Sequence, residues 1–388
     1  MHILLSKFCK LTPGEIGQVI KDGERHKLQD AIKLLSEKLG KRIALHSLTL
    51  PPVHEFSARD RSSGKLRDYC EEAVIQQICN YIAVEALMPL FQAKIGAHQC
   101  ASLVNRGQRY GKMHIERWMR RDPKGTRNAI QADVRKAYPS TDKRRLKRML
   151  KRDVKNDDLL WLVFLLLDKM PKGLSIGSYL SMYLCNYMLS YAWRFAKQRI
   201  CHAEWRKHRR TGIYERHSIP LIRKVMLYMD DILAYGANKR DLLKGFGELC
   251  RFMRKKLGYR IKRSWRHFRT HFTDKAGRQR GSFTDIMGVR IYRDHSTLRR
   301  RIFLRTRKTY AKMERRTRGC RPISKRLAGR VVAYHGWLVH SDSRQWMKRH
   351  AYKHGLITRA KRTIAFYAKK ARENHDSEGR ILPSACTC

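Results

Sequence analysis

The sequence predicts an α+β fold, which combines an antiparallel sheet with helices. Two short apolar runs, residues 225–227 and 232–234, flank a polar centre and indicate two strands joined by a tight turn. Apolar residues recur at helical spacing in residues 71–92 and 157–171. From about residue 304 onward, the pattern is again helical and strongly basic. This mixture of strands and helices is typical of an α+β protein.

The chain carries a large excess of positive charge. Its 388 residues include 86 Lys and Arg against 33 Asp and Glu, a formal net charge of +53. Such an excess favours a polyanionic partner, above all a nucleic acid. Because the basic residues are spread along the chain, we expect a broad binding surface instead of a basic tail. The length suits two or three subdomains with a sizeable core.

Cysteine usage and hydropathy indicate a cytoplasmic protein with no membrane association. None of the 10 cysteines forms a CxxC pair, and Cys386 and Cys388 are separated by a single residue, a poor zinc spacing. Reduced thiols in the core are the better interpretation. Residues 1–7 are too short an apolar run for a signal peptide, and the longest run, residues 159–167, is about half of a membrane span.

The N-terminal part is predicted to be helical up to a break at residues 51–52, which are both proline. Residues 53–69 then indicate a hairpin with its turn at residues 62–64. Lys65 and Arg67 are two positions apart, so a strand would direct both side chains to one face. Two neighbouring cations suit a triphosphate or a template phosphate, and a solvated edge strand is the alternative.

A predicted strand at residues 128–134 places Asp133 at its end. A carboxylate at the end of an apolar strand is a common way to hold a metal ion over a sheet. Tyr138 follows five residues later, and Asp142 or Thr141 is expected to cap the next helix, which is very basic. Asp133 is therefore a candidate metal ligand.

A glycine-interrupted loop at residues 172–181 leads into another predicted helix. Gly177 would allow a close approach of the backbone to a ligand. The hydroxyls of Ser178 and Ser181 can donate to a base, a sugar or a phosphate. This loop is a candidate nucleic-acid contact.

The following segments are predicted from their patterns alone. Residues 201–220 are expected to form a basic surface loop, residues 241–257 an amphipathic helix and residues 259–262 a strand. Residues 284–292 indicate a hairpin arm, with Gly288 at a close approach of the chain.

Asp230 and Asp231 lie between the apolar runs at residues 225–227 and 232–234. Burying two neighbouring carboxylates without a partner costs several kcal/mol, so they should face a cation or water. An Asp-Asp turn on the surface is the alternative. Together with Asp133, however, they make three carboxylates at strand ends, and such a set can hold two Mg²⁺ ions about 3.5–4 Å apart.

The ordered set of motifs closely resembles that of the reverse transcriptases, over roughly residues 50–305. Residues 228–231, Tyr-Met-Asp-Asp, match the family's YxDD box, and residues 133–138 match its first catalytic motif. Residues 176–181 resemble its template-primer loop, and residues 286–289 its primer-grip hairpin. Lys262 falls where the family keeps a lysine near the triphosphate.

This resemblance implies a right-hand polymerase fold with fingers, a ferredoxin-like palm and a helical thumb. The implied parts are a helical N-terminal extension at 1–50, fingers at 51–127, a palm at 128–295, and a basic helical thumb with a C-terminal tail at 296–388. Fingers helices would be interleaved at 143–172, and the basic insertion would lie at 201–220.

The implied activity is RNA-directed DNA polymerisation, in which dNTPs are added to a primer 3′-hydroxyl with two Mg²⁺ ions, or Mn²⁺ as a substitute. The implied metal ligands and catalytic groups are Asp133, Asp230, Asp231 and the Val134 carbonyl. The implied dNTP contacts are Lys65, Arg67, Tyr138, Gly177 and Lys262, with Tyr138 under the sugar, where it would exclude a 2′-hydroxyl. The implied template and primer contacts are Ser178, Ser181, Tyr228, Met229, Met287 and Gly288. Implied partners are an RNA template, such as a cognate noncoding RNA, the nascent DNA, and an accessory protein or a second copy.

One residue of the loop bears on the branch of the family. Ile176 takes the place usually held by Gln, which is similar to reverse transcriptases of diversity-generating retroelements, although Met182 departs from the Gln usual in that group. No ribonuclease H or integrase pattern follows the thumb, so a stand-alone bacterial or phage enzyme is expected. A defence-associated reverse transcriptase that acts with a noncoding RNA against phage is the alternative. A non-catalytic RNA-binding protein with a polymerase-like fold is the alternative from another class; a basic structural protein would explain the charge but not the motif order.

Overall fold

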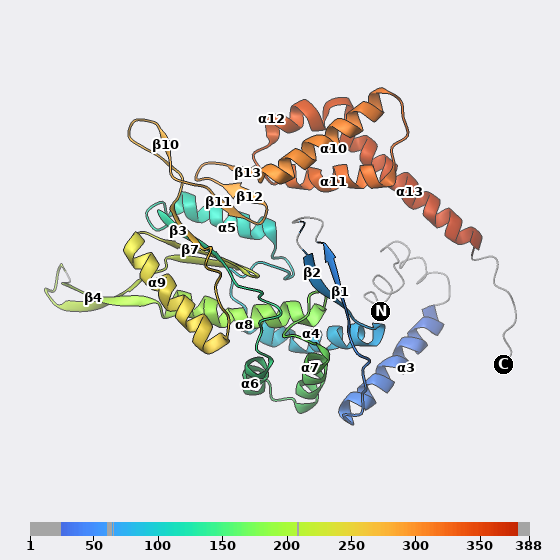
Figure 1. Ribbon diagram of the computed structural model, residues 1–388, viewed down its shortest axis with the longest axis horizontal. Coiled ribbons are helices and arrows are strands. Elements are labelled where there is room, and N and C mark those ends of the chain that lie inside the picture. Colours follow the sequence, from blue (N-terminus) through green and yellow to red (C-terminus); the bar gives the residue numbers. More distant parts are fainter. Residues whose placement is uncertain (1–24, 60–63, 65, 208, 379–388) are drawn as a thin grey trace. The chain divides into compact units, whose positions relative to one another are not determined.

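The computed structural model describes residues 25–59, 64, 66–207 and 209–378 (Figure 1). It confirms the mixed α+β character of the chain. The chain divides into two compact units, one made of Met1–Arg106 and Ile130–Arg266 and the other of Gly107–Ala129 and His267–Cys388. The four-part partition into extension, fingers, palm and thumb stays a prediction.

The first unit holds most of the helices around a small sheet. Its helices are α3 (Arg25–Ala44), α4 (Val74–Lys94), α6 (Lys143–Asp153), α7 (Asp157–Lys169), α8 (Tyr179–Gln198) and α9 (Lys239–Phe252), which continues into a π-helical turn at Met253–Leu257. Its strands are β1 (His54–Arg59), β2 (Leu66–Glu71), β4 (Cys201–Lys207), β5 (Tyr214–Pro220), β6 (Lys224–Tyr228) and β7 (Asp231–Gly236), and β3 (Asn128–Asp133) runs into this unit from the other.

The main sheet has the strand order β6-β7-β3-β8, with β8 at Arg266–Arg269. The strands β6 and β7 are antiparallel and pair Tyr228 with Asp231, so their connection is the two-residue loop Met229-Asp230. The apolar side chains of β7 are buried, and Ile232 and Ala234 join those of α4, α7 and α8 in one contiguous core. The predicted pair of strands around the two aspartates is therefore confirmed.

A buried carboxylate ties α4, α6 and α8 together. Asp153 accepts hydrogen bonds from the hydroxyls of Tyr187 and Tyr191 at 2.7 and 2.6 Å, and it pairs with the Lys94 ammonium at 3.0 Å. Burial alone would raise the pKa of Asp153, but these partners, together with Arg152, hold it well below its usual range. The helix α8, which follows the loop at residues 172–178, is thus fixed to α4 and α6 by a charged anchor.

The second unit consists of short strands and basic helices. Its helices are α5 (Gln108–Arg121), α10 (Arg300–Arg318), α11 (Lys325–Val339), α12 (Arg344–Trp346) and α13 (Leu356–Glu378), with a π-helical turn at Met347–Ala351 and a 3-10 turn at Lys353–Gly355. Its strands are β9 (Phe272–Thr273), β10 (Gln279–Arg280), β11 (Thr284–Ile286), β12 (Val289–Ile291) and β13 (Ser296–Leu298). The predicted hairpin at residues 284–292 and the helical C-terminal part are confirmed.

Two expectations on local structure are wrong. Residues 201–220 do not form a loop. They form the hairpin β4–β5, whose strands pair at seven positions and direct successive side chains to opposite faces. Residues 259–262 form no strand; only Val134 and Ile261 form a bridge, because the chain turns away at residues 263–264.

Among the described residues, one helix, α4, is long and apolar enough to cross a membrane by length and composition. It packs in the core of the first unit, where Val84, Leu87 and Phe91 are buried together with the polar Gln76 and Asn80. These contacts are those of a core helix in a folded domain.

The described cysteines are free thiols of mixed exposure. Cys79, Cys100 and Cys185 are buried, and burial raises the pKa of Cys79 to about 11, which makes it inert at neutral pH. Cys201 and Cys320 are exposed, so the expected core position holds for only part of the set. Cys386 and Cys388 lie outside the described residues.

Candidate active site

The tip of the β6–β7 hairpin presents two consecutive carboxylates. Met229 adopts a φ of 52°, in the left-handed region that costs a residue with a side chain about 1–2 kcal/mol. The carbonyl of Asp230 accepts a hydrogen bond from the backbone N–H of Val134 at 2.8 Å. This bond ties the tip of the hairpin to the end of β3, where Asp133 lies.

Asp133 pairs with Lys262 through both backbone and side chain. The backbone N–H of Lys262 donates to the Asp133 carbonyl at 2.9 Å, and its ammonium lies 2.9 Å from Asp133 Oδ2. Both side chains are 37% exposed, so water screens this ion pair in part. The bridge between Val134 and Ile261 holds the two chain segments in this register.

Asp230 lies among charges of both signs. Burial raises the pKa of the Asp230 carboxyl, and the negative charge of Asp133 raises it further. The cations Lys262 and Arg67 lower it. Four groups that the motifs single out are thus close enough to affect one another, although they come from four separate segments of the chain.

A cavity of about 900 Å³ opens in front of the hairpin tip, within the first unit. Its lining includes the predicted residues Arg67, Tyr138, Gly177, Ser178, Tyr228, Met229, Asp230 and Asp231. The lining also contains two cations that no motif singles out, Lys136 and Lys172. The volume lies at the upper end of the range for small-molecule sites, so a nucleotide can be accommodated.

The ring of Tyr138 is fixed in the wall of this cavity. Its hydroxyl donates to the Met229 sulfur at 3.7 Å, and its carbonyl accepts from the Leu174 N–H at 2.9 Å. Burial raises the pKa of Tyr138 well above its usual range, so the phenol is neutral at any physiological pH. The ring therefore acts through its shape and not through charge.

The conformation of Gly177 has a different physical reason from the expected one. Its φ is +116°, and a Cβ added there would lie 2.8 Å from the carbonyl oxygen of Cys70 in β2. The Cys70 N–H in turn donates to the Ile176 carbonyl at 2.9 Å. The glycine thus allows the loop to pack on β2, and this packing places Ile176 and Gly177 in the cavity wall.

The two predicted serines are placed differently. Ser178 lines the cavity and is the N-cap of α8, where its hydroxyl accepts from the Ser181 N–H at 3.4 Å. Ser181 is fully buried, and its hydroxyl accepts from the Ser175 N–H at 3.2 Å and donates to the Met170 sulfur. A contact between Ser181 and a nucleic acid would require this hydroxyl to leave both partners.

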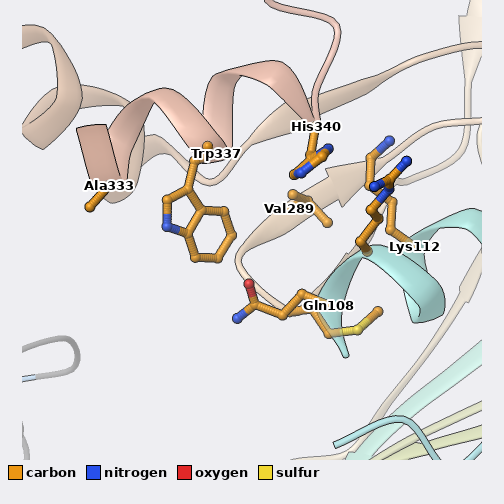
Figure 2. Close-up of a pocket in the computed structure, with 9 residues that line it drawn as sticks. Gln108, Lys112, Val289, Ala333, Trp337 and His340 are labelled. Carbon is orange, nitrogen blue, oxygen red and sulfur yellow. The ribbon is translucent and has the colours of Figure 1, made fainter. Parts of the chain in front are cut away.

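Three further predicted residues lie outside the described part of the first unit. Lys65 lies outside the described residues. Met287 and Gly288 form the turn between β11 and β12 in the second unit, with φ values of 53° and 79°, as a tight hairpin turn requires. Met287 lines a pocket of about 240 Å³ beside Trp337, and Figure 2 shows the indole ring at its edge with Gln108 below it.

A second groove lies in the first unit, and apart from Lys262 and residues 135–136 its lining lies outside the motifs. Its volume is about 1080 Å³, and its lining contains Trp265 and no acidic residue. The basic residues in the lining are Arg135, Lys136, Arg251, Arg254, Arg260, Lys262 and Arg263. The basic runs at residues 254–256 and 260–263 were the available signal in the sequence. Such a lining favours a polyanion.

The donor set at the hairpin tip fits a hard cation in its chemistry. The carboxylates of Asp133, Asp230 and Asp231 and the Val134 carbonyl offer only oxygen, which Mg²⁺ prefers. Burial first, and then the negative charge of Asp133, raise the pKa of Asp230, and a bound cation would lower it. In the described part of the chain, however, no group of three or more His, Cys, Asp or Glu side chains is arranged to hold a metal ion. The Asp133 carboxylate is paired with Lys262 instead.

No known protein-family model and no curated protein matches this chain. It resembles solved structures of telomerase. For telomerase from Candida tropicalis in complex with a TWJ fragment of telomeric RNA, the identity is 11% and the TM-score 0.44, over 78% of this chain and 56% of that chain. For the apo telomerase from Candida tropicalis truncated from its C-terminal domain, the identity is 12% and the TM-score 0.42, over 69% of this chain and 60% of that chain. For telomerase from Candida albicans in complex with a TWJ fragment of telomeric RNA, the identity is 9% and the TM-score 0.43, over 65% of this chain and 46% of that chain.

The chain therefore spans between about half and three-fifths of the length of these telomerase chains. At these identities and TM-scores, the likeness to telomerase carries no assignment of activity.

Proposed function

We propose that this chain is an RNA-directed DNA polymerase, a reverse transcriptase that adds dNTPs to a primer 3′-hydroxyl. One observation carries the proposal: Asp230 and Asp231 stand at a hairpin tip tied to the end of β3, and they face a cavity that Arg67 and Tyr138 also line. Carboxylates, a cation and a ring in one nucleotide-sized cavity are what two-metal nucleotidyl transfer requires. The sheet and hairpin would belong to the palm of a right-hand polymerase.

The carboxylates would hold two Mg²⁺ ions, for which Mn²⁺ can substitute. Asp133 and Asp230 would be the principal ligands, with Asp231 and the Val134 carbonyl in support. When bound, the ions would lower the pKa of the attacking hydroxyl and neutralise charge on the triphosphate. For Asp133 to take part, its carboxylate must exchange the Lys262 ammonium for the ion.

Other residues would bind and orient the nucleotide. Arg67 lies in the cavity and affects the Asp230 carboxyl, so its guanidinium can contact a triphosphate there, and Lys65 and Lys262 are proposed to assist. Tyr138 would lie against the sugar, where its ring leaves no room for a 2′-hydroxyl. Gly177 and Ser178 would shape the wall next to the base.

Nucleic-acid contacts are proposed in each unit separately. Tyr228 and Met229 at the hairpin tip are proposed to position the primer end. Met287 and Gly288, in the β11–β12 turn of the second unit, are proposed to contact the primer strand. The template would be an RNA, in a bacterial or phage setting a cognate noncoding RNA in the cytoplasm, and an accessory protein or a second copy of the chain is a further proposed partner.

The proposal predicts Mg²⁺-dependent extension of a DNA primer on an RNA template by the purified full-length chain. Addition of excess EDTA should abolish extension, and addition of excess Mg²⁺ or Mn²⁺ should restore it, because the hydroxyl cannot be activated by the carboxylates alone. Gel-resolved extension of a labelled primer measures this. Protein prepared in parallel with Asp230→Asn excludes a contaminating polymerase, and extension that survives EDTA would contradict the proposal.

A non-catalytic RNA-binding protein with the same fold is the second candidate. The observation in its favour is the pairing of Asp133 with Lys262, together with the net charge of +53. Binding of RNA without any incorporation of dNTPs, on RNA and DNA templates alike, would establish this candidate and reject the polymerase.

The proposed setting is error-prone cDNA synthesis in a diversity-generating retroelement. Ile176 lines the cavity, and an aliphatic side chain cannot hydrogen-bond the nascent base pair. The alternative is an antiphage defence role with a noncoding RNA. The neighbouring genes distinguish these settings: a variable target gene with its template repeat, or a group of defence genes.

We expect Ile176→Gln to lower the misincorporation rate by about 2- to 10-fold, because one hydrogen bond contributes about 0.5–1.5 kcal/mol. Sequencing of cDNA copied from a defined RNA measures the rate. Ile176→Val keeps the aliphatic surface and should leave the error spectrum as it is. If the Gln variant makes the same errors as the wild type, Ile176 does not set fidelity.

A further inference from the structure

The hairpin β4–β5 has one face that carries aromatic rings and cations. Its register pairs Trp205 with Arg216 and Lys207 with Tyr214. In an antiparallel pair, directly opposite residues point to the same side, and so do residues two apart on one strand. These four side chains therefore share one side, which we call the aromatic face.

The acidic residues of the hairpin lie on the opposite side. Glu204 pairs with His217 in the register, and Glu215 occupies the position next to Arg216. His217 also lies 3.7 Å from the Glu215 carboxylate. The aromatic face thus has cations and no acid, whereas Glu204 and Glu215 both lie on the opposite face.

The aromatic face is open to solvent. Trp205 is 64% exposed and Tyr214 is 62% exposed, although rings of this size are normally covered. The base of the hairpin is anchored, because Ile200 and Leu221 are buried and joined by a backbone hydrogen bond at 3.1 Å. Figure 1 shows β4 extending away from α8 and α9 of its unit.

We propose that the aromatic face binds a single-stranded stretch of nucleic acid, outside the cavity that holds the carboxylates. Exposed rings stack on unpaired bases, and flanking cations contact the adjoining phosphates. Bases in a duplex are already stacked, and the major groove of an RNA duplex is too narrow for side chains to read. The inference does not rest on the polymerase proposal, since it requires no catalysis.

Charge favours this occupant over a second copy of the chain. Two aromatic faces laid against each other would bring Lys207 and Arg216 near their own copies, which like charges oppose. A polyanion meets both cations favourably. The nucleic acid can be RNA or single-stranded DNA, because stacking does not depend on the sugar.

The test measures binding of fluorescent 12-nucleotide oligo-U and oligo-dT to the full-length chain by anisotropy, without dNTPs or Mg²⁺. We expect the double variant Trp205→Ala, Tyr214→Ala to bind single strands about 25-fold more weakly or worse, since each of the two stacks is worth about a factor of five or more. The double variant should bind a 12-base-pair blunt duplex as tightly as the wild type does. Equal weakening with both oligomers identifies a sugar-independent site, and weakening with oligo-U alone identifies an RNA site.

A second pair of variants tests the cations. Lys207→Gln and Arg216→Gln should each reduce the slope of log affinity against log salt by about 0.7, the value for one phosphate contact with a single strand. A 4-thiouridine oligomer crosslinked by ultraviolet light should map to peptides that contain Trp205 or Tyr214.

The matched control removes aromatic rings from the opposite face. His202→Ala with His217→Ala should bind as the wild type does, and Trp205→Phe with Tyr214→Phe should keep most of the affinity, which excludes misfolding as the cause of a loss. The proposal is overturned if the double Ala variant binds single strands as tightly as the wild type, or loses duplex binding equally. It is also overturned if light scattering shows that this variant converts a dimer to a monomer.

Discussion

Asp230→Asn is expected to reduce dNTP incorporation by about 10³-fold or more, because it removes the charge of a proposed principal metal ligand while keeping its size. Single-turnover extension of a primer on an RNA template at saturating dNTP measures the loss. The same change removes a partly buried charge that the Asp133 carboxylate opposes, so the thermal midpoint of unfolding should not fall below that of the wild type. Lost activity with retained stability is the signature of a functional carboxylate.

Asp168→Asn is the matched control for this prediction. Asp168 is 61% exposed and pairs with Lys147 on the surface of the same unit, so it offers the same chemical change away from the cavity. Its activity should stay within about twofold of the wild type, as expected for an exposed pair. If Asp230→Asn keeps more than a tenth of wild-type incorporation, the catalytic role of Asp230 is wrong.

Tyr138→Ala is expected to admit ribonucleotides. The hydroxyl of the ring donates to the Met229 sulfur and Tyr138 lines the cavity, so removal of the ring opens space at the cavity wall. We expect the ratio of kcat/KM for dNTP over NTP to fall by about 10- to 200-fold, the range for a steric change in a substrate pocket. Primer extension with each nucleotide in separate reactions gives this ratio.

Tyr138→Phe separates the ring from its hydroxyl. This variant loses only the hydrogen bond to Met229 and should keep the discrimination against ribonucleotides. Discrimination that is unchanged in the Ala variant would show that another side chain, and not Tyr138, excludes the 2′-hydroxyl.

The parts of the site that local pattern specifies were predictable. The hairpin around Asp230 follows from two apolar runs and a polar centre, and Asp133 follows from its place at a strand end. Asp142 caps α6 as expected, since its carboxylate accepts from the Arg145 N–H at 3.1 Å. Each of these features depends on residues within a few positions of one another.

The parts that depend on distant segments were not predictable. The second groove, which basic residues line, forms because residues 135–136, 251–254 and 260–263 meet only in the folded chain. Gly177 packs against Cys70, more than a hundred residues away, so its pattern alone could not reveal the partner. The β4–β5 hairpin was not predicted, because its many basic residues are typical of a solvated loop. Only the alternation of its side chains between two faces indicates strands.

The contact between Asp133 and Lys262 has a consequence for how the chain folds. The Lys262 ammonium is a counterion of the Asp133 carboxylate, and the backbone hydrogen bond between the same two residues keeps it close. A sheet that ended in three uncompensated carboxylates would repel itself until a divalent ion arrived, which would make folding wait for the metal. With the lysine in place, the sheet can assemble before any divalent ion is bound, and the metal ion of our proposal would then replace the ammonium at Asp133.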